Sequence, residues 1–208
     1  MPTTSLSSPE DVVNAALVQI GFKKQVGSLY DGSMHSVLAL QIFGQTRDDM
    51  LRGGNWGFAR RDASLTLQKQ APVGGYVPGF TTWTRAAYPP QAWLYQYGYP
   101  DDCLQVGIVK PGLIFVPNFD PGPNPWAIDN DNTYTPGRKV ILSNVGPDAL
   151  ITYIGRVTDP KLWDANFAEA LVDQLGKKLA PALTGLEPAQ MSAIMGEKDA
   201  ATAKMEQG

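Results

Sequence analysis

The feature that most constrains the fold is a change in the spacing of apolar residues along the chain. Near both ends, apolar residues recur at intervals of three and four, the period of an amphipathic helix. Between residues 63 and 157 they occur in short runs broken by glycine and proline, which is typical of strands. The sequence therefore predicts an α+β protein: an antiparallel α-helical bundle from both chain ends, with a β-rich central insertion, an antiparallel sheet or barrel-like structure, that carries long loops.

Three helices are predicted from their capping residues and apolar stripes. Ser8 precedes a proline and a helical pattern over residues 9–20, which ends at a glycine. A second helix is expected over residues 33–52, from a serine cap to a pair of glycines. A third begins at Asp159, and Pro181 should kink or end it. The bundle is therefore expected to be built by the two ends of the chain.

The central segment is predicted to form several strands joined by unusually long connections. The strand-like runs are residues 63–68, 93–97, 104–109, 113–116, 139–142 and 150–154. Residues 71–90 and 118–138 are too long for ordinary connectors in a compact domain. Their aromatic side chains favour burial against a partner. We expect contacts with other subunits or with the tail at these residues: Tyr76, Phe80, Trp83, Tyr88, Trp126 and Tyr134.

The charge and the composition argue against several classes of function. The 208 residues carry a net charge of −3, without the basic footprint that sequence-specific DNA binding needs. A single cysteine excludes an internal disulfide, and a single histidine leaves no Cys and His set for zinc. The chain shows neither a signal peptide nor an apolar run long enough for a membrane helix. We therefore expect a protein made in the cytoplasm, without a membrane partner.

Catalytic arrangements are not expected. His35, the only imidazole, is interpreted as a partly exposed polar residue at a helix start. Asp101 and Asp102 are neighbours in a strand and point to opposite faces, so they cannot act as a pair on one bond. Cys103 follows these carboxylates, which would raise its thiol pKa, and is interpreted as a buried small hydrophobe. Residues 129–132 hint at a calcium loop but lack its glycine and bidentate glutamate. The sequence predicts no enzyme, metal or cofactor.

Aromatic residues gather at three places in the sequence. One pair follows the second helix, three aromatics alternate along the strand 93–97 and share one face, and two lie in the last helix. These are interpreted as core residues: Trp56, Phe58, Trp93, Tyr95, Tyr97, Trp163 and Phe167. An exposed aromatic row would instead stack sugars or bases, so a carbohydrate-binding module stays open as an alternative.

Several short motifs follow one another in a set order. They are ALVQIG at 16–21, RDDML leading to WGFAR at 47–60, SLTL at 64–67, WLYQY at 93–97, YPDDCL at 99–104, DPKLW at 159–163 and LAPALT at 179–184. This order resembles the head-to-tail connector family of tailed bacteriophages, the tail tubular or adaptor proteins that dock under the portal. The resemblance implies a structural virion protein in the neck or tail, assembled as a ring, usually of twelve copies, whose lumen passes double-stranded DNA without reading its sequence.

The resemblance also implies partners and a division of the chain. The portal protein lies on one side of such a ring, and a tail tube, nozzle or next tail protein on the other. Residues 1–62 and 158–186 would form the helical bundle, 63–157 the insertion, and 187–208 a portal-binding arm. Contacts with the portal are expected from Met191, Ile194, Met195 and Met205, whose flexible side chains suit a partner groove. A tail or baseplate accessory protein is a further alternative.

Overall fold

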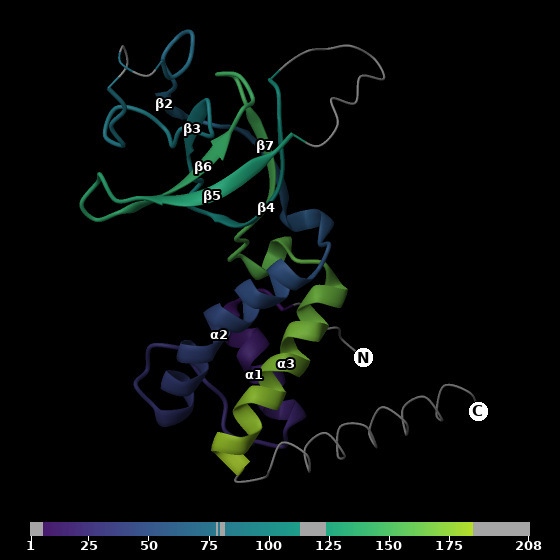
Figure 1. Cartoon of the computed structure of the whole chain (residues 1–208). Coiled ribbons are helices and arrows are strands. Elements are labelled where there is room, and N and C mark those ends of the chain that lie inside the picture. The colour runs from purple at the N-terminus through teal and green to yellow at the C-terminus, as the bar shows by residue number, and fades with distance from the viewer. Residues whose placement is uncertain (1–5, 78, 80–81, 113–123, 185–208) are drawn as a thin grey trace. The chain divides into compact units, whose positions relative to one another are not determined.

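The computed structural model describes residues 6–77, 79, 82–112 and 124–184, which fall into two compact units (Figure 1). Unit 1 consists of Met1–Phe58 and Val157–Gly208, and unit 2 of Ala59–Arg156. The described helices longer than one turn belong to unit 1, and the described strands belong to unit 2. Unit 2 is therefore inserted into unit 1 along the chain.

The first two helices begin where the sequence predicts. The helix α1 (Pro9–Gln19) follows Ser8, whose hydroxyl accepts a hydrogen bond from the backbone N–H of Asp11 at 3.2 Å. The Asp11 carboxylate accepts the backbone N–H of Ser8 at 3.0 Å in return, which completes a capping box. The helix α2 (Met34–Gly53) has Ser33 as its N-cap. Both predicted helices are confirmed.

The third helical region differs from the prediction. Asp159 caps only a short 3₁₀ turn, η2 (Pro160–Leu162), after which Trp163 has an extended backbone. The helix α3 (Ala165–Thr184) begins beyond it and continues through Pro181. A continuous helix from Asp159 is therefore wrong, and the proline does not end α3. Packing decides both points, since the side chains that face the other helices are buried along most of its length.

The helices do not form the predicted bundle from both chain ends. Both α1 and α2 pack on α3, which is their shared partner. The described part of the chain is a mixed structure of three α-helices and two separate antiparallel sheets, about 34% helix and 24% strand. On α2, the apolar side chains of Met34, Val37 and Leu40 are exposed. The fold-class prediction, with its bundle and barrel-like insertion, is therefore wrong.

Unit 2 holds two antiparallel sheets that share one core. Their strands are β1 (Arg60–Ser64), β2 (Leu67–Gln70), β3 (Tyr95–Gly98), β4 (Cys103–Lys110), β5 (Trp126–Asp131), β6 (Arg138–Ser143) and β7 (Leu150–Gly155). The strand orders are β1-β7-β4 and β2-β3-β6-β5. Tyr97 and Ile141 from the second sheet join Val109 and Ile151 from the first in one buried apolar cluster.

Some strands were predicted with the wrong bounds and one was missed. The run 63–68 is split between β1 and β2, because Leu65 turns into the core between them. The strand β5 lies within what the sequence suggested was a long loop. It is the last strand of its sheet and only one of its six residues is buried, so its apolar pattern is weak. The predicted strand 113–116 lies outside the described residues.

Candidate functional site

A buried ion pair joins the two outer strands of the four-stranded sheet. Lys69 in β2 and Asp131 at the end of β5 lie 2.5 Å apart between Nζ and Oδ2, with side chains 6% and 0% exposed. The ammonium also donates to the Arg85 carbonyl at 2.7 Å and to the Thr133 hydroxyl at 3.1 Å. All three of its protons are therefore used, as a buried charge requires.

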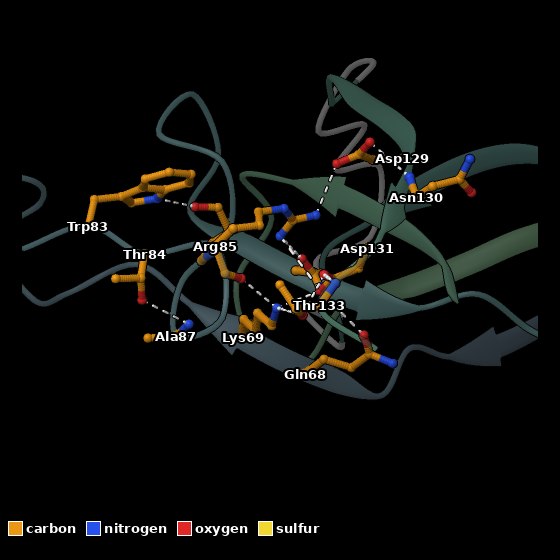
Figure 2. A network of polar contacts seen from close by, with 12 residues as sticks. Gln68, Lys69, Trp83, Thr84, Arg85, Ala87, Asp129, Asn130, Asp131 and Thr133 are labelled. Atoms are coloured by element: carbon orange, nitrogen blue, oxygen red, sulfur yellow. Dashed lines mark hydrogen bonds and ion pairs between the residues drawn. The ribbon is translucent and has the colours of Figure 1, made fainter. Parts of the chain in front are cut away.

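Gln96 and Arg85 extend this network across the sheet (Figure 2). The side-chain N–H groups of the buried Gln96 donate to the Asp131 carboxylate at 2.7 Å and to the side-chain oxygen of Gln68 at 3.3 Å. The side-chain oxygen of Gln96 accepts a hydrogen bond from the Arg85 guanidinium. Arg85 also pairs with Asp129 at 2.9 Å. Because Arg85 belongs to the long connection between β2 and β3, these bonds fix that part of the connection to the sheet.

The hydrogen bonds of this network keep the Asp131 carboxylate ionised. Burial alone would raise the pKa of the Asp131 carboxyl, but hydrogen bonds from Lys69, Thr133 and Gln96 outweigh it and hold the pKa well below its usual range. A carboxylate that stays ionised and is surrounded by donors has no proton to give near neutral pH. Its role is to position the residues around it.

A polar groove of about 530 Å³ lies where β3 ends and β6 begins. It is lined by Gln68, Gly98, Tyr99, Pro100, Asp101, Cys103, Arg138 and Lys139. The pairing of β2 with β3 is irregular between Leu67 and Lys69, so Gln68 occupies a bulge. Bulges re-aim a side chain, and here the Gln68 amide turns towards the groove. We call the space lined by these eight residues the polar groove.

Arg138 and Lys139 bring two positive charges to the polar groove. The Arg138 guanidinium lies 4.7 Å from the centroid of the Tyr134 ring, and Lys139 Nζ lies 4.5 Å from that of Tyr99. Within the described ranges neither makes an ion pair with a carboxylate. Contact with a ring positions a cation without neutralising it. Both charges are therefore available to a ligand.

Unit 1 exposes an apolar face on the first half of α2. Met34, Val37 and Leu40 are 76%, 43% and 39% exposed and follow one another at intervals of three residues. Tyr30, which precedes the helix, is 81% exposed. We call these four residues the α2 face. Contiguous exposed apolar patches are typical of interaction surfaces, so this face is a candidate for one.

A second apolar surface of unit 1 is concave. A groove of about 430 Å³ lies against α1 and α3, with acidic side chains among its apolar ones. It is lined by Leu6, Ala15, Val18, Gln19, Glu169, Val172 and Asp173. Asp173 accepts a hydrogen bond from Gln19 at 2.6 Å, which ties the two helices together beside it. We call it the α1/α3 groove.

The predicted core aromatics of unit 1 meet around Phe167. This ring is fully buried and lies 5.0 Å from Trp56, 5.2 Å from Phe58 and 5.2 Å from Trp163 between ring centroids. Trp163 is buried as well, whereas Trp56 and Phe58 are only half-buried. The cluster is therefore centred on α3 and not on the segment that follows α2.

The aromatic strand of unit 2 is shorter than predicted. Trp93 precedes β3 and is half-buried, so it does not continue the row of the strand. Tyr95 and Tyr97 stack with ring centroids 6.2 Å apart. Tyr97 is fully buried, and its hydroxyl donates to the carbonyl of Val145 at 2.7 Å. No exposed row of three rings is present in this strand.

The aromatics of the first long connection find partners within the chain. The Tyr76 hydroxyl and the Trp83 indole N–H both donate to the Pro89 carbonyl, at 2.9 and 2.8 Å. Tyr88 packs edge-on against Tyr76 with ring centroids 6.2 Å apart. These three rings are half-buried and hold the connection in a compact shape.

The remaining predicted contact residues are divided between described and undescribed parts. Trp126 packs against the core of unit 2, and Tyr134 lies under Lys69 and Arg138. Phe80 lies outside the described residues. So do the residues predicted to contact the portal: Met191, Ile194, Met195 and Met205.

His35 and Cys103 are both buried. The expectation of a partly exposed His35 is wrong, because the Phe22 ring packs against it at 5.8 Å. Its imidazole lies 3.1 Å from the Ser33 hydroxyl. Burial raises the pKa of the Cys103 thiol more than the adjacent Asp102 carboxylate does. Asp102 itself accepts hydrogen bonds from Arg61 and Tyr153.

Comparisons with known proteins assign no family. The sequence matches no protein-family model, and no curated protein gives a significant match. In the part of the chain that the structure describes, no group of three His, Cys, Asp or Glu side chains could hold a metal ion. No helix in that part is long and apolar enough to cross a membrane. Function must therefore be argued from the surfaces themselves.

Proposed function

We propose that this chain is a structural subunit of the adaptor ring that joins the portal to the tail in a tailed bacteriophage. The order of its sequence motifs supports the proposal, and the α2 face is the structural observation that carries it. An adaptor subunit must bury apolar surface against other protein, and this face is apolar and exposed. Its partners are further copies of itself, the portal protein and, on the tail side, a tube, nozzle or next tail protein.

A ring requires two different surfaces on each subunit, because each copy contacts a different patch on the next copy. Unit 1 carries such a pair, the α2 face and the α1/α3 groove. The groove contains Glu169 and Asp173, and the connection before the α2 face exposes Lys23 and Lys24. Acidic side chains in the groove and exposed basic side chains elsewhere on unit 1 favour contact between unlike surfaces of neighbouring copies. The negative net charge of each subunit also suits a channel through which DNA slides without being held.

Replacing Val37 with glutamate is expected to abolish ring formation while leaving the monomer folded. A charge at the centre of the α2 face cannot be buried against another copy without a partner. Electron microscopy of the chain mixed with its portal should show rings below the portal for the natural chain and none for Val37→Glu. Gln45→Glu adds the same charge on the polar second half of the exposed side of α2, and should assemble normally. Equal ring formation by both variants would disprove a role for the α2 face.

Deleting residues 187–208 is expected to abolish attachment to portal-bearing heads. These residues are proposed as the portal-binding arm, and they lie outside the described residues. The remaining chain keeps α1, α2 and α3, so its thermal melting should stay close to that of the full chain. Co-sedimentation with purified heads measures the attachment. A truncated chain that still sediments with heads at normal affinity would place the portal contact elsewhere in the subunit.

A further inference from the structure

We propose that the polar groove of unit 2 binds an acidic sugar, held by its carboxylate. This inference goes beyond the adaptor role and does not depend on it. Three donor groups line the groove from two separate segments: Gln68 comes from the bulge in β2, and Arg138 and Lys139 come from the start of β6. Tyr99 and Asp101, from the connection between β3 and β4, also line it. The volume of about 530 Å³ is typical of sites for small organic ligands.

A hydrogen bond to the Gln68 side-chain oxygen orients the amide and leaves its nitrogen without a partner among the described residues. Its oxygen accepts a hydrogen bond from the buried Gln96 at 3.3 Å, and Gln96 is held in turn by Asp131. Figure 2 shows the Gln68 oxygen facing the network and its nitrogen pointing away from it. Among the described residues this nitrogen donates no hydrogen bond, and the bond of the side-chain oxygen to Gln96 is the one that orients the amide. The amide is therefore a donor oriented before any ligand arrives.

Gly98 keeps the space beside this amide open. A Cβ at this position would lie 3.2 Å from Gln68 Nε2, closer than most real contacts. The glycine has an ordinary strand conformation and pairs with Val140 in β6, so backbone freedom does not explain it. The close approach of the Gln68 side chain explains why glycine occupies this position.

The donors select an anion, and the other lining groups select a sugar acid. Arg138, Lys139 and Gln68 all line the groove, and guanidinium, ammonium and amide N–H groups are donors that a carboxylate accepts. Asp101 also lines the groove and is exposed, so its carboxylate can accept hydrogen bonds from the hydroxyl groups of a sugar. A phosphate dianion would meet the Asp101 charge with no hydroxyl to offer it. The volume exceeds a single sugar ring, so a disaccharide unit is the expected occupant.

The test is a calorimetric titration of the full chain with digalacturonic acid and with its dimethyl ester. The ester has the same sugar rings and no charge. We expect saturable binding of the acid and at least about tenfold weaker binding of the ester, because charge-assisted hydrogen bonds are about twice as strong as neutral ones. Free galacturonate and a longer oligogalacturonate distinguish a small metabolite from a polysaccharide as the source. Stronger binding of the longer oligomer indicates a polysaccharide, and equal binding indicates the free acid.

Variants locate the binding in the polar groove. Arg138→Gln and Lys139→Gln remove one charge each and should weaken binding of the acid about fivefold or more, whereas their effect on the ester should be small. Lys177→Gln removes the same charge from an exposed position on α3 and should bind like the natural chain. Gly98→Ala crowds the Gln68 amide and should weaken binding as well. Thermal melting of each variant confirms that it is folded.

Four results would overturn the proposal. They are equal affinity for acid and ester, no heat of binding up to about 10 mM acid, undiminished binding by folded Arg138→Gln and Lys139→Gln, and tighter binding of inorganic phosphate than of the acid. Ring formation on the portal is measured separately, so failure of this site leaves the proposed adaptor function untouched.

Discussion

Replacing Phe167 with alanine is expected to lower the free energy of unfolding of unit 1 by about 3 to 5 kcal/mol. The side chain is fully buried, and the rings of Trp56, Phe58 and Trp163 all lie within 5.2 Å of it between centroids. Removing it leaves a cavity that three large neighbours cannot fill together. Urea denaturation followed by tryptophan fluorescence measures the change, because two of these neighbours are the reporters.

Leu162→Ala is the matched control for this prediction. Leu162 lies five residues earlier and is 62% exposed, so its truncation should change the free energy of unfolding by no more than about 0.5 kcal/mol. Alanine at Trp56 or Phe58 should cost less than at Phe167, since both rings are only half-buried. A loss below about 1 kcal/mol for Phe167→Ala would show that the cluster is not the core of this unit.

Breaking the buried ion pair of unit 2 is expected to have an effect of similar size. Lys69→Met leaves the fully buried Asp131 carboxylate without its cation, and removal of one partner of such a pair costs about 3 to 5 kcal/mol. The double variant Lys69→Met with Asp131→Asn removes both charges and should recover a large part of the loss. A double-mutant cycle measured by urea denaturation gives the coupling.

The same substitution in an exposed pair provides the control. Lys110 and Asp62 lie 3.1 Å apart with side chains 40% and 61% exposed, and Lys110→Met should cost at most about 1 kcal/mol. If Lys69→Met and Lys110→Met cost the same, burial contributes nothing to the Lys69–Asp131 pair.

The pH dependence of stability follows from the direction of the Asp131 shift. Its pKa in the folded protein lies below that of an unfolded chain, about 3.9. The ionised carboxylate therefore stabilises the folded state fully above the unfolded pKa, and this stabilisation is lost as the pH falls below it. Asp131→Asn should flatten the decline in unfolding free energy between about pH 5 and pH 3 relative to the natural chain.

The starts of α1 and α2 could be predicted from the sequence, because each depends on residues close to it along the chain. The capping box at Ser8 and Asp11 and the serine cap at Ser33 place α1 and α2, because a cap bonds to the backbone only a few residues away. The start of α3 was misplaced for the same reason. Asp159 does cap a turn, but only long-range packing decides that Trp163 breaks the helix and Ala165 restarts it.

The candidate sites depend on contacts that the sequence does not display. Lys69 and Asp131 are 62 residues apart, and Lys69 belongs to no recognisable motif. The polar groove depends on a bulge at Gln68 and on the missed strand β5, whose pairing with β6 positions Arg138 beside the groove. The α2 face depends on which elements pack on α2, and the spacing of apolar residues along the helix does not show which of its sides stays exposed.

The position of α3 along the chain has a consequence for synthesis. Both α1 and α2 pack on this helix, which is encoded after the whole of unit 2. During translation, unit 2 is complete once residue 156 has left the ribosome, whereas the first two helices must wait for residues 165–184 before they can bury their apolar sides. The α2 face therefore becomes a folded surface only after residue 184 has left the ribosome. Under the proposed adaptor role, chains terminated before α3 would lack this surface and would not enter a ring.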